Sequence, residues 1–181
     1  MLTEFQKKKL AVLYSMYDAD KNGVIELADF YVLLDKYAEV RGWEPGSPEY
    51  EVLKSQLVSR WHTMQEAADT NRDNQISRSE WLVYIDNMLS SPATFDAEVT
   101  KIVAAIFAIF DLDGNGSLEL EEYRQLYRAT GIDEAFADEN FGRLDLSNNG
   151  HISKEQHLEL FRQFFYSQDP DSPGNWVLGP Y

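Results

Sequence analysis

The segment from Asp111 to Glu122, with the sequence DLDGNGSLELEE, places oxygen-bearing side chains at regular intervals directly after the apolar run IVAAIFAIF. Asp111, Asp113, Asn115 and Glu122 occupy positions 1, 3, 5 and 12 of a twelve-residue loop. Gly116 stands at position 6, where the backbone must turn sharply. Carboxylate and amide oxygens at this spacing can surround one hard cation, and calcium takes about 6 to 8 such oxygens. The segment therefore predicts a calcium-binding loop.

The remaining positions of this loop complete the EF-hand pattern. Ser117 at position 7 would contribute its backbone carbonyl, and Glu119 at position 9 would act through a water molecule. Glu122 would close the site with both carboxylate oxygens. An acidic turn kept only for solubility would not need glycine at position 6, an aliphatic residue at position 8 and an acid at position 12 together.

The same template fits the segment from Asp18 to Asp29, which predicts a first metal site. Its ligands would be Asp18, Asp20, Asn22, the carbonyl of Val24 and Asp29. Aspartate is one methylene shorter than glutamate, so Asp29 should reach the ion with one oxygen more readily than with two. A lower coordination number suits magnesium, and we expect magnesium to compete with calcium most strongly at this site.

A second site is predicted between Asp69 and Glu80. Its ligands would be Asp69, Asn71, Asp73, the carbonyl of Gln75 and Glu80. Asn74 stands at position 6, and asparagine tolerates a positive φ angle better than other residues with side chains. Together the three loops predict three calcium ions per chain.

The fourth repeat, Asp145 to Gln156, departs most from the template. It keeps Gly150 at position 6 but has Ser147, Asn149 and Gln156 at positions 3, 5 and 12, so one charged ligand remains. A neutral amide cannot supply a bidentate carboxylate, so we expect this loop not to bind calcium. It would serve as a structural partner, with Ile152 pairing with Leu118 as Ile25 pairs with Ile76.

Helical periodicity covers most of the chain and predicts an all-α fold of four EF-hand units in two compactly packed pairs. Thr3 with Gln6 forms a predicted capping box, and Ser47 before Pro48 marks another helix start. Residues 42–47 and 90–94 are predicted linkers. The predicted organisation is an N-terminal pair at 1–90, a C-terminal pair at 91–167 and an apolar tail at 168–181.

Each loop is followed by a large side chain and then by apolar residues at helical spacing, which predicts the core face of an exit helix. The residues that directly follow the loops are Phe30, Trp81, Tyr123 and His157. The pairs that follow them are Leu33/Leu34, Tyr84/Ile85, Leu126/Tyr127 and Leu160/Phe161. His157 is thus expected to be packed in the core. His151 stands at position 7 of the fourth loop, where only the backbone carbonyl would matter. His62 has no carboxylate or nucleophile at a telling spacing, so we expect no enzymatic activity.

The charge balance excludes several classes of partner. The 181 residues include 16 Lys and Arg against 31 Asp and Glu, which gives a net charge of −15. This sign disfavours nucleic acid and anionic membranes and favours cations. Cysteine is absent. The N-terminal sequence MLTEFQKKKL contains no signal-peptide core and no myristoylation glycine, so we expect a cytoplasmic protein without a membrane anchor, and a monomer.

The chain resembles the sarcoplasmic calcium-binding proteins and their relatives calexcitin and calerythrin. The resemblance rests on the four loops, the aspartate that closes the first one, a long first linker with RGW and the tail FFYSQDPDSPGNWVLGP. This resemblance spans the whole chain and implies a cytosolic calcium and magnesium buffer or a sensor. Photoproteins and luciferin-binding proteins share the architecture. Photoproteins carry a histidine within the last helix, whereas His157 only begins that helix here, so light emission is not expected.

Three functions remain open, namely a buffer, a sensor that binds a protein target, and a carrier of an apolar ligand such as a luciferin. A sensor exposes a methionine-rich groove, but this chain has four methionines and none in the second pair, which favours a buffer. The tail residues Trp176, Val177, Leu178 and Tyr181 are too apolar to remain in water. We expect the tail to dock in the groove between the helices and to bury Trp176.

Overall fold

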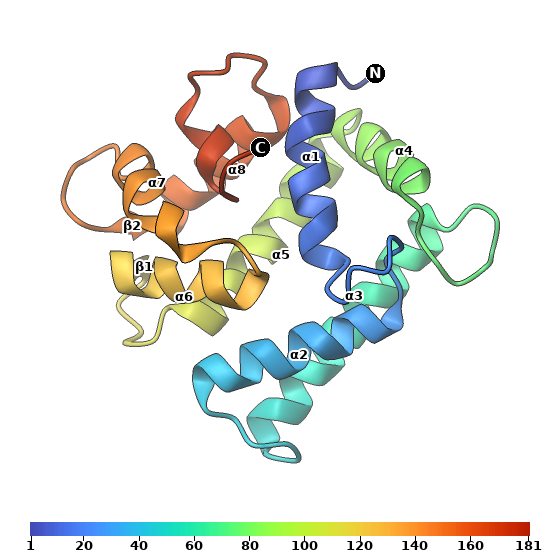
Figure 1. Ribbon diagram of the computed structural model, residues 1–181, viewed down its shortest axis with the longest axis horizontal. Coiled ribbons are helices and arrows are strands. Elements are labelled where there is room, and N and C mark those ends of the chain that lie inside the picture. Colours follow the sequence, from blue (N-terminus) through green and yellow to red (C-terminus); the bar gives the residue numbers. More distant parts are fainter.

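The computed structural model describes residues 1–181, and helices make up most of it (Figure 1). The α-helices are α1 (Glu4–Tyr17), α2 (Leu27–Arg41), α3 (Pro48–Ala68), α4 (Arg78–Leu89), α5 (Pro92–Phe110), α6 (Leu120–Thr130), α7 (Ala137–Leu144) and α8 (Lys154–Tyr166). Two short 3-10 helices, η1 (Glu134–Phe136) and η2 (Pro173–Trp176), and two strands, β1 (Ser117–Leu118) and β2 (Ile152–Ser153), complete it. The predicted all-α fold is confirmed.

The starts of α1, α3, α4 and α8 carry capping residues whose side chains accept from otherwise unpaired backbone N–H groups. The Gln6 amide donates to Thr3 Oγ1 over 3.2 Å and the Thr3 amide to Gln6 Oε1 over 3.0 Å, as a capping box requires. The Tyr50 amide donates to Ser47 Oγ over 3.2 Å at the start of α3. The predicted linker at 90–94 is wrong in its second half, because α5 begins at Pro92. Proline favours the first position of a helix, and this signal outweighs its role as a breaker.

The loops pair as the sequence predicts. Leu118 lies opposite Ile152 in the antiparallel pair of β1 and β2, and Ile25 forms an isolated antiparallel bridge with Ile76. All four side chains are fully buried. The aliphatic residue at position 8 of each loop therefore joins two loops and anchors them in the core.

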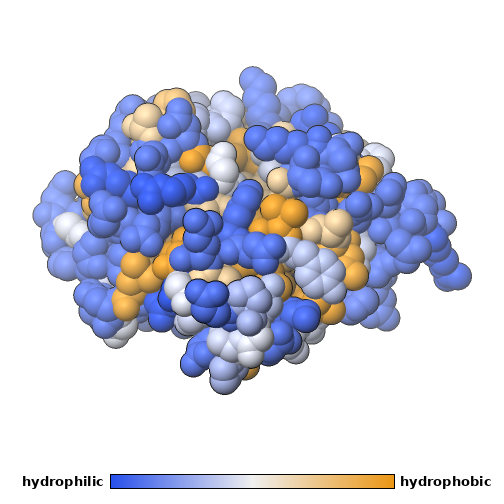
Figure 2. Space-filling view, turned by 60° about the horizontal axis from the view of Figure 1, so that its bottom comes forward, coloured by the Kyte–Doolittle hydropathy of each residue, from blue (hydrophilic) through white to orange (hydrophobic).

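One hydrophobic cluster contains residues from both halves of the sequence. Helix α2 packs against α5 and α6, α4 against α5, and α1 against α8. The residues that directly follow the four loops, Phe30, Trp81, Tyr123 and His157, are buried as predicted, but Tyr84 is only half-buried. Hydrophilic residues cover most of the face in Figure 2, and apolar ones reach the surface in the depressions between them. No helix combines the length and apolar content needed to cross a membrane.

The tail folds back onto the second half of the molecule, where η2 packs against α7 and α8. Asn175, Val177 and Leu178 are buried, whereas Trp176 is only half-buried and lies 4.1 Å from the Arg143 guanidinium. The tail therefore docks as predicted, but Trp176 is not the residue that it buries most deeply. Trp176 lies over a charged side chain at the edge, and its neighbours on either side fill the interior.

The tail also contacts α1, so the two ends of the chain meet. Lys9 is fully buried, and its Nζ donates to the Ser167 carbonyl over 2.9 Å and to Asn175 Oδ1 over 2.8 Å. The rings of Phe5 and Tyr181 meet edge to face with centroids 5.3 Å apart. These contacts attach the first helix to the last segment.

Candidate metal centres

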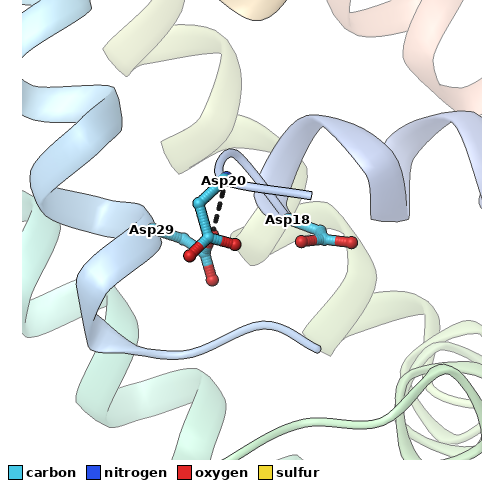
Figure 3. Close-up of side chains that lie close together, drawn as sticks. All are labelled: Asp18, Asp20 and Asp29. Atoms are coloured by element: carbon cyan, nitrogen blue, oxygen red, sulfur yellow. Dashed lines mark hydrogen bonds between the residues drawn. The ribbon is translucent and has the colours of Figure 1, made fainter. Parts of the chain in front are cut away.

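The first loop connects α1 to α2 and brings three carboxylates together (Figure 3). Asp18, Asp20 and Asp29 each offer an oxygen, and these oxygens all lie within 4.8 Å of one another. Asp29 is fully buried in the first turn of α2. Its Oδ2 accepts from the Glu26 amide over 2.7 Å and its Oδ1 from the Asp20 amide over 3.1 Å. These two bonds fix the closing carboxylate at the loop interior.

Asn22 and Val24, the other predicted ligands of the first loop, lie on its exposed and half-buried side. The Asn22 side-chain amide donates to Asp20 Oδ2 over 3.1 Å, and its Oδ1 accepts from the Val24 amide over 3.0 Å. This hydrogen bond holds the loop in a tight turn around the carboxylates. The assignment of Asn22 and Val24 as ligands stays a prediction.

The third loop repeats this arrangement between α5 and α6. Oxygens of Asp111, Asp113 and Glu122 all lie within 4.8 Å of one another. Glu122 Oε1 accepts from the Leu112 amide over 2.8 Å and Oε2 from the Glu119 amide over 3.0 Å. Asn115 Oδ1 accepts from the Ser117 amide over 2.8 Å, as Asn22 does in the first loop. Two separated loops thus build equivalent carboxylate clusters.

A buried oxygen at position 1 distinguishes these two loops. In each aspartate one oxygen accepts from the glycine amide at position 6, over 3.1 Å for Asp18 and 3.0 Å for Asp111. The other oxygen, Oδ1 of Asp18 and of Asp111, is buried without a hydrogen-bond partner. Removing a carboxylate oxygen from water without a partner is costly. A hard cation would supply the missing interaction, so both loops fit calcium.

The second loop does not gather its carboxylates to the same degree, since Asp69, Asp73 and Glu80 form no cluster of this kind. Asp69 uses both oxygens, accepting from the Arg72 amide over 2.7 Å and from the Asn74 amide over 3.0 Å. Asn71 and Gln75 each join Asp73, through the Asn71 side-chain amide over 3.0 Å and the Gln75 backbone amide over 2.9 Å.

Glu80 is fixed at the end of the second loop by its own hydrogen bonds. Its Oε1 accepts from Thr70 and its Oε2 from Ser77, with the Ser77 hydroxyl 2.7 Å away. Hydrogen bonds from Ser77, followed by those from Thr70, lower the pKa of Glu80 to about 2. This carboxylate is ionised at neutral pH, but both of its oxygens already accept hydrogen bonds. The difference from the first and third loops lies at position 1, where an ion would have to replace the hydrogen bond from the Arg72 amide to Asp69 Oδ1.

The fourth loop satisfies its polar groups without a cation. Asp145 accepts from the Gly150 amide over 2.7 Å, the Asn149 amide over 3.3 Å and the Ser147 hydroxyl over 3.1 Å. Gln156 Oε1 accepts from the Ser153 amide over 2.8 Å. Hydrogen bonds thus hold this loop in the EF-hand conformation, with one carboxylate at its centre.

Protons compete for the closing carboxylates of the two clustered loops. Burial raises the pKa of Asp29. Burial and the neighbouring Glu119 raise the pKa of Glu122. Metal ligands must be deprotonated, so calcium affinity at both loops should fall as the solution becomes acidic.

One contact between loops was not predicted from the sequence. The ring of His151 lies with Nδ1 2.7 Å from Glu119 Oε1, joining position 7 of the fourth loop to position 9 of the third. Sequence reasoning considered only the backbone carbonyl of His151. The antiparallel pairing of β1 with β2 could have revealed the contact, because it places the two loops side by side.

His157 lies in the core as predicted. It is fully buried among aromatic rings, with Phe107 at 5.7 Å and Phe161 at 5.2 Å between centroids. Neither ring nitrogen has a hydrogen-bond partner. Burial lowers the pKa of His157 to about 3, so the ring is neutral. It has no carboxylate or nucleophile beside it with which to act as a base.

Comparison with known proteins agrees with this geometry. The family model described as an EF-hand domain pair matches residues 59–128, which include the second and third loops. Calerythrin of Saccharopolyspora erythraea is 24% identical over 170 residues, covering 93% of this chain and 96% of that protein. Sarcoplasmic calcium-binding protein 1 of Astacus leptodactylus is 27% identical, covering 95% of this chain and 93% of its own.

Among solved structures, the sarcoplasmic calcium-binding protein from amphioxus superimposes with a TM-score of 0.78. The two chains cover each other completely and are 20% identical, so this likeness concerns the fold. Four loops of EF-hand geometry, the family match and end-to-end relatives of one kind lead to the same assignment. The chain contains an EF-hand domain pair and is similar over nearly its whole length to sarcoplasmic calcium-binding proteins and calerythrin.

Proposed function

We propose that this protein is a monomeric cytosolic calcium and magnesium buffer that binds three calcium ions, at its first, second and third loops. The observation that carries the proposal is the pair of buried, unpartnered oxygens on Asp18 and Asp111, each within a cluster of carboxylates. Both atoms belong to the aspartate at position 1 of an EF-hand loop, and a bound cation would supply the interaction that each of them lacks. The second loop is proposed as a weaker site, because an ion there must displace hydrogen bonds.

Asp29 supports magnesium competition at the first loop. It is fully buried, and its side chain is one methylene shorter than a glutamate, so it reaches an ion with both oxygens less readily. Magnesium needs fewer protein oxygens and keeps more of its water. The third loop closes with the longer Glu122, which can approach an ion with two oxygens.

The docked tail favours a buffer over a sensor. The Tyr123 hydroxyl donates to the Val177 carbonyl over 2.7 Å and the Tyr127 hydroxyl to the Trp176 carbonyl over 3.1 Å. Tyr123 and Tyr127 lie on α6, the exit helix of the third loop, which a sensor would present to its target. In this protein the chain's own tail covers that helix.

Calorimetric titration with calcium, with and without magnesium, tests the proposal. We expect three ions per chain for the unmodified protein and two each for Glu80→Gln and Glu122→Gln. Gln156→Ala is the matched control in the fourth loop and should keep all three. Magnesium should weaken calcium binding more at the first loop than at the third, and Asp29→Glu should reduce this difference. A stoichiometry of four, or a loss of one ion in Gln156→Ala, would contradict the assignment.

A further inference from the structure

Arg41, the last residue of α2, connects the exit helix of the first loop to the third loop. Its Nη1 donates to the backbone carbonyl of Asp111, position 1 of the third loop, over 3.2 Å. The Arg41 guanidinium also lies 5.3 Å from the centre of the Trp43 ring. One turn earlier on α2, Tyr37 meets Phe110 edge to face with ring centroids 5.8 Å apart. Two contacts at helical spacing therefore hold the end of α2 against the start of the third loop.

The hydrogen bond from Arg41 takes the place of one that the first and fourth loops make internally. In those loops the carbonyl at position 1 accepts from the backbone amide at position 4. The donor is Lys21 in the first loop, over 3.3 Å, and Asn148 in the fourth, over 3.1 Å. In the third loop position 4 is Gly114, whose amide does not make this bond. The third loop thus obtains its donor from a helix of the other EF-hand pair.

This donor brings a positive charge that no carboxylate partner cancels. The other half-buried arginines, Arg60 and Arg124, each pair with glutamates, whereas Arg41 makes no ion pair. Its acidic neighbours in the sequence, Glu39 and Glu44, are exposed. The contacts of the Arg41 guanidinium are a neutral carbonyl and an aromatic ring. Its charge therefore acts on the third loop through space rather than through an ion pair.

The guanidinium is close enough to act on an ion in this loop. A backbone carbonyl oxygen lies within about 6 Å of the carboxylate oxygens of its own residue, because only a few covalent bonds join them. Arg41 Nη1 is therefore within about 9 Å of the Asp111 carboxylate, whereas charges are screened over about 8 Å at physiological salt. The carboxylates of Asp111, Asp113 and Glu122 attract the guanidinium, and a calcium ion among them would repel it. The charge of Arg41 thus favours the loop without an ion.

We infer that Arg41 is a positioning residue of the third metal site, supplied by the first EF-hand, and that its charge sets the calcium affinity there. Its hydrogen bond fixes the backbone at position 1 and leaves Asp111 Oδ1 without a partner, available to the ion. Its charge stabilises the ion-free loop and holds the calcium affinity below the value that the carboxylates alone would give. The inference deepens the proposed function and rests on calcium binding at the third loop.

Amide NMR of the full chain at a series of buffered free calcium concentrations tests the inference. The Gly116 amide reports the third loop and the Gly23 amide the first, since each donates to the aspartate at position 1 of its loop. In Arg41→Gln the calcium affinity seen at Gly116 should rise by about threefold to tenfold at low salt. The gain should largely disappear at about 1 M salt, because the charge is then screened. The affinity seen at Gly23 should not change, because Arg41 lies about 18 Å along α2 from the first loop.

Two further variants separate charge from other effects. Arg41→Lys keeps the charge and should bind calcium within about twofold of the unmodified protein. Lys8→Gln is the matched control, because it removes one exposed, unpaired positive charge from α1, and it should leave the Gly116 titration unchanged. A second readout is thermal unfolding. Arg41→Gln should lower the melting temperature more in chelator than in saturating calcium, because the lost attraction belongs to the ion-free loop.

Several results would overturn the inference. Unchanged or weaker calcium binding at Gly116 in Arg41→Gln would do so. Equal tightening in Arg41→Lys, or a gain that persists at high salt, would show that the charge does not set the affinity. A failure of the buffer proposal has a different signature. The Gly116 amide of the unmodified protein would then not respond to calcium, while Arg41→Gln would still lower the melting temperature in chelator.

Discussion

His157 shows how one residue of the EF-hand repeat can carry a cost that its counterparts avoid. The equivalent positions after the other loops hold Phe30, Trp81 and Tyr123. The histidine ring fills the same aromatic site, but both of its nitrogens are buried without partners. An unsatisfied buried polar group costs about 1 to 3 kcal/mol. The position therefore leaves the core less stable than a fully apolar ring would.

Replacing this ring, in His157→Phe, should raise the free energy of unfolding by about 1 kcal/mol at neutral pH. It should also reduce acid sensitivity. Because burial lowers the native pKa of His157 to about 3 from its ordinary value of 6.5, the unfolded chain binds a proton between these values that the native state does not. Stability is therefore lost as pH falls from about 6.5 toward 3, by up to about 1.4 kcal/mol per pH unit. Urea unfolding in chelator across this range measures the difference.

His62→Phe is the control for this substitution, because His62 is an exposed residue of α3. Loss of its ring should leave the core unchanged. If His157→Phe and the unmodified protein lose stability in parallel between pH 6.5 and pH 4, the buried histidine does not contribute to acid sensitivity.

At the scale of elements, the loops were predictable because their geometry is local. A glycine at position 6 and an oxygen at positions 1 and 12 lie within twelve residues, so the pattern specifies the turn directly. The pairing of Leu118 with Ile152 could be predicted equally well, since position 8 is apolar in both loops. The arrangement of the carboxylates in the second loop could not be predicted from the sequence. Whether Asp69 and Glu80 face each other depends on hydrogen bonds from Arg72 and Thr70, which the ligand pattern does not encode.

Contacts between distant segments explain the other differences. Nothing near Lys9 in the sequence indicates that a lysine is buried in α1, because its acceptors, Ser167 and Asn175, lie at the other end of the chain. The same holds for the tail. Apolar composition predicted that it would dock, but only the packing of η2 against α7 and α8 decides that Val177 is buried more deeply than Trp176.

Asn74 in the second loop has φ = 63°, the left-handed conformation that glycine adopts at this position in the other loops. Asn74→Val should lower the free energy of unfolding by about 1 to 2 kcal/mol, because a branched side chain clashes in this region. Asn74→Gly should stay within about 0.5 kcal/mol of the unmodified protein. Gln65→Ala removes only the 2.8 Å hydrogen bond between these side chains, so it separates that effect in thermal unfolding. Similar losses for valine and glycine would argue against backbone strain.

The contact between η2 and α8 depends on Gly174, because a Cβ there would collide with the Leu160 carbonyl and Gln163 Cβ. Gly174→Ala should therefore lower the free energy of unfolding by about 1 to 3 kcal/mol, as overpacking does. Gly142→Ala in α7 is the matched control, since its Cβ would meet nothing within 4 Å. It should be neutral or stabilising by up to about 1 kcal/mol. Calorimetric melting of both variants distinguishes close packing from a general effect of alanine.

For the whole molecule, charge and metal binding should be coupled to stability. Each bound calcium ion would make the net charge of −15 less negative by two units and relieve repulsion within the clusters at Asp18 and Asp111. Chelator should therefore lower the melting temperature strongly and broaden the amide NMR spectrum. A chelated protein that melts at the temperature of the calcium-loaded one would contradict this expectation.

Removal of the tail tests its role in closing the molecule. Deleting residues 170–181 exposes the surface that Val177 and Leu178 cover and takes Asn175 away from the buried Lys9. We expect a loss of a few kcal/mol in the free energy of unfolding and calcium-dependent binding of a hydrophobic dye, which the intact chain should lack. A chain lacking only Tyr181 is the control. An unchanged melting temperature without dye binding would show that the tail contributes nothing to closure.

The meeting of Phe5 with Tyr181 has a practical consequence for engineering. Because the first and last segments lie against each other, a short peptide could join them with little distortion, and new ends could be opened in the exposed linker at 42–47. Such a circular permutant would keep every loop intact while cutting between α2 and α3, the exit helix of the first loop and the entry helix of the second. Fluorescent proteins fused at the new ends would then test whether calcium changes the distance between these two helices.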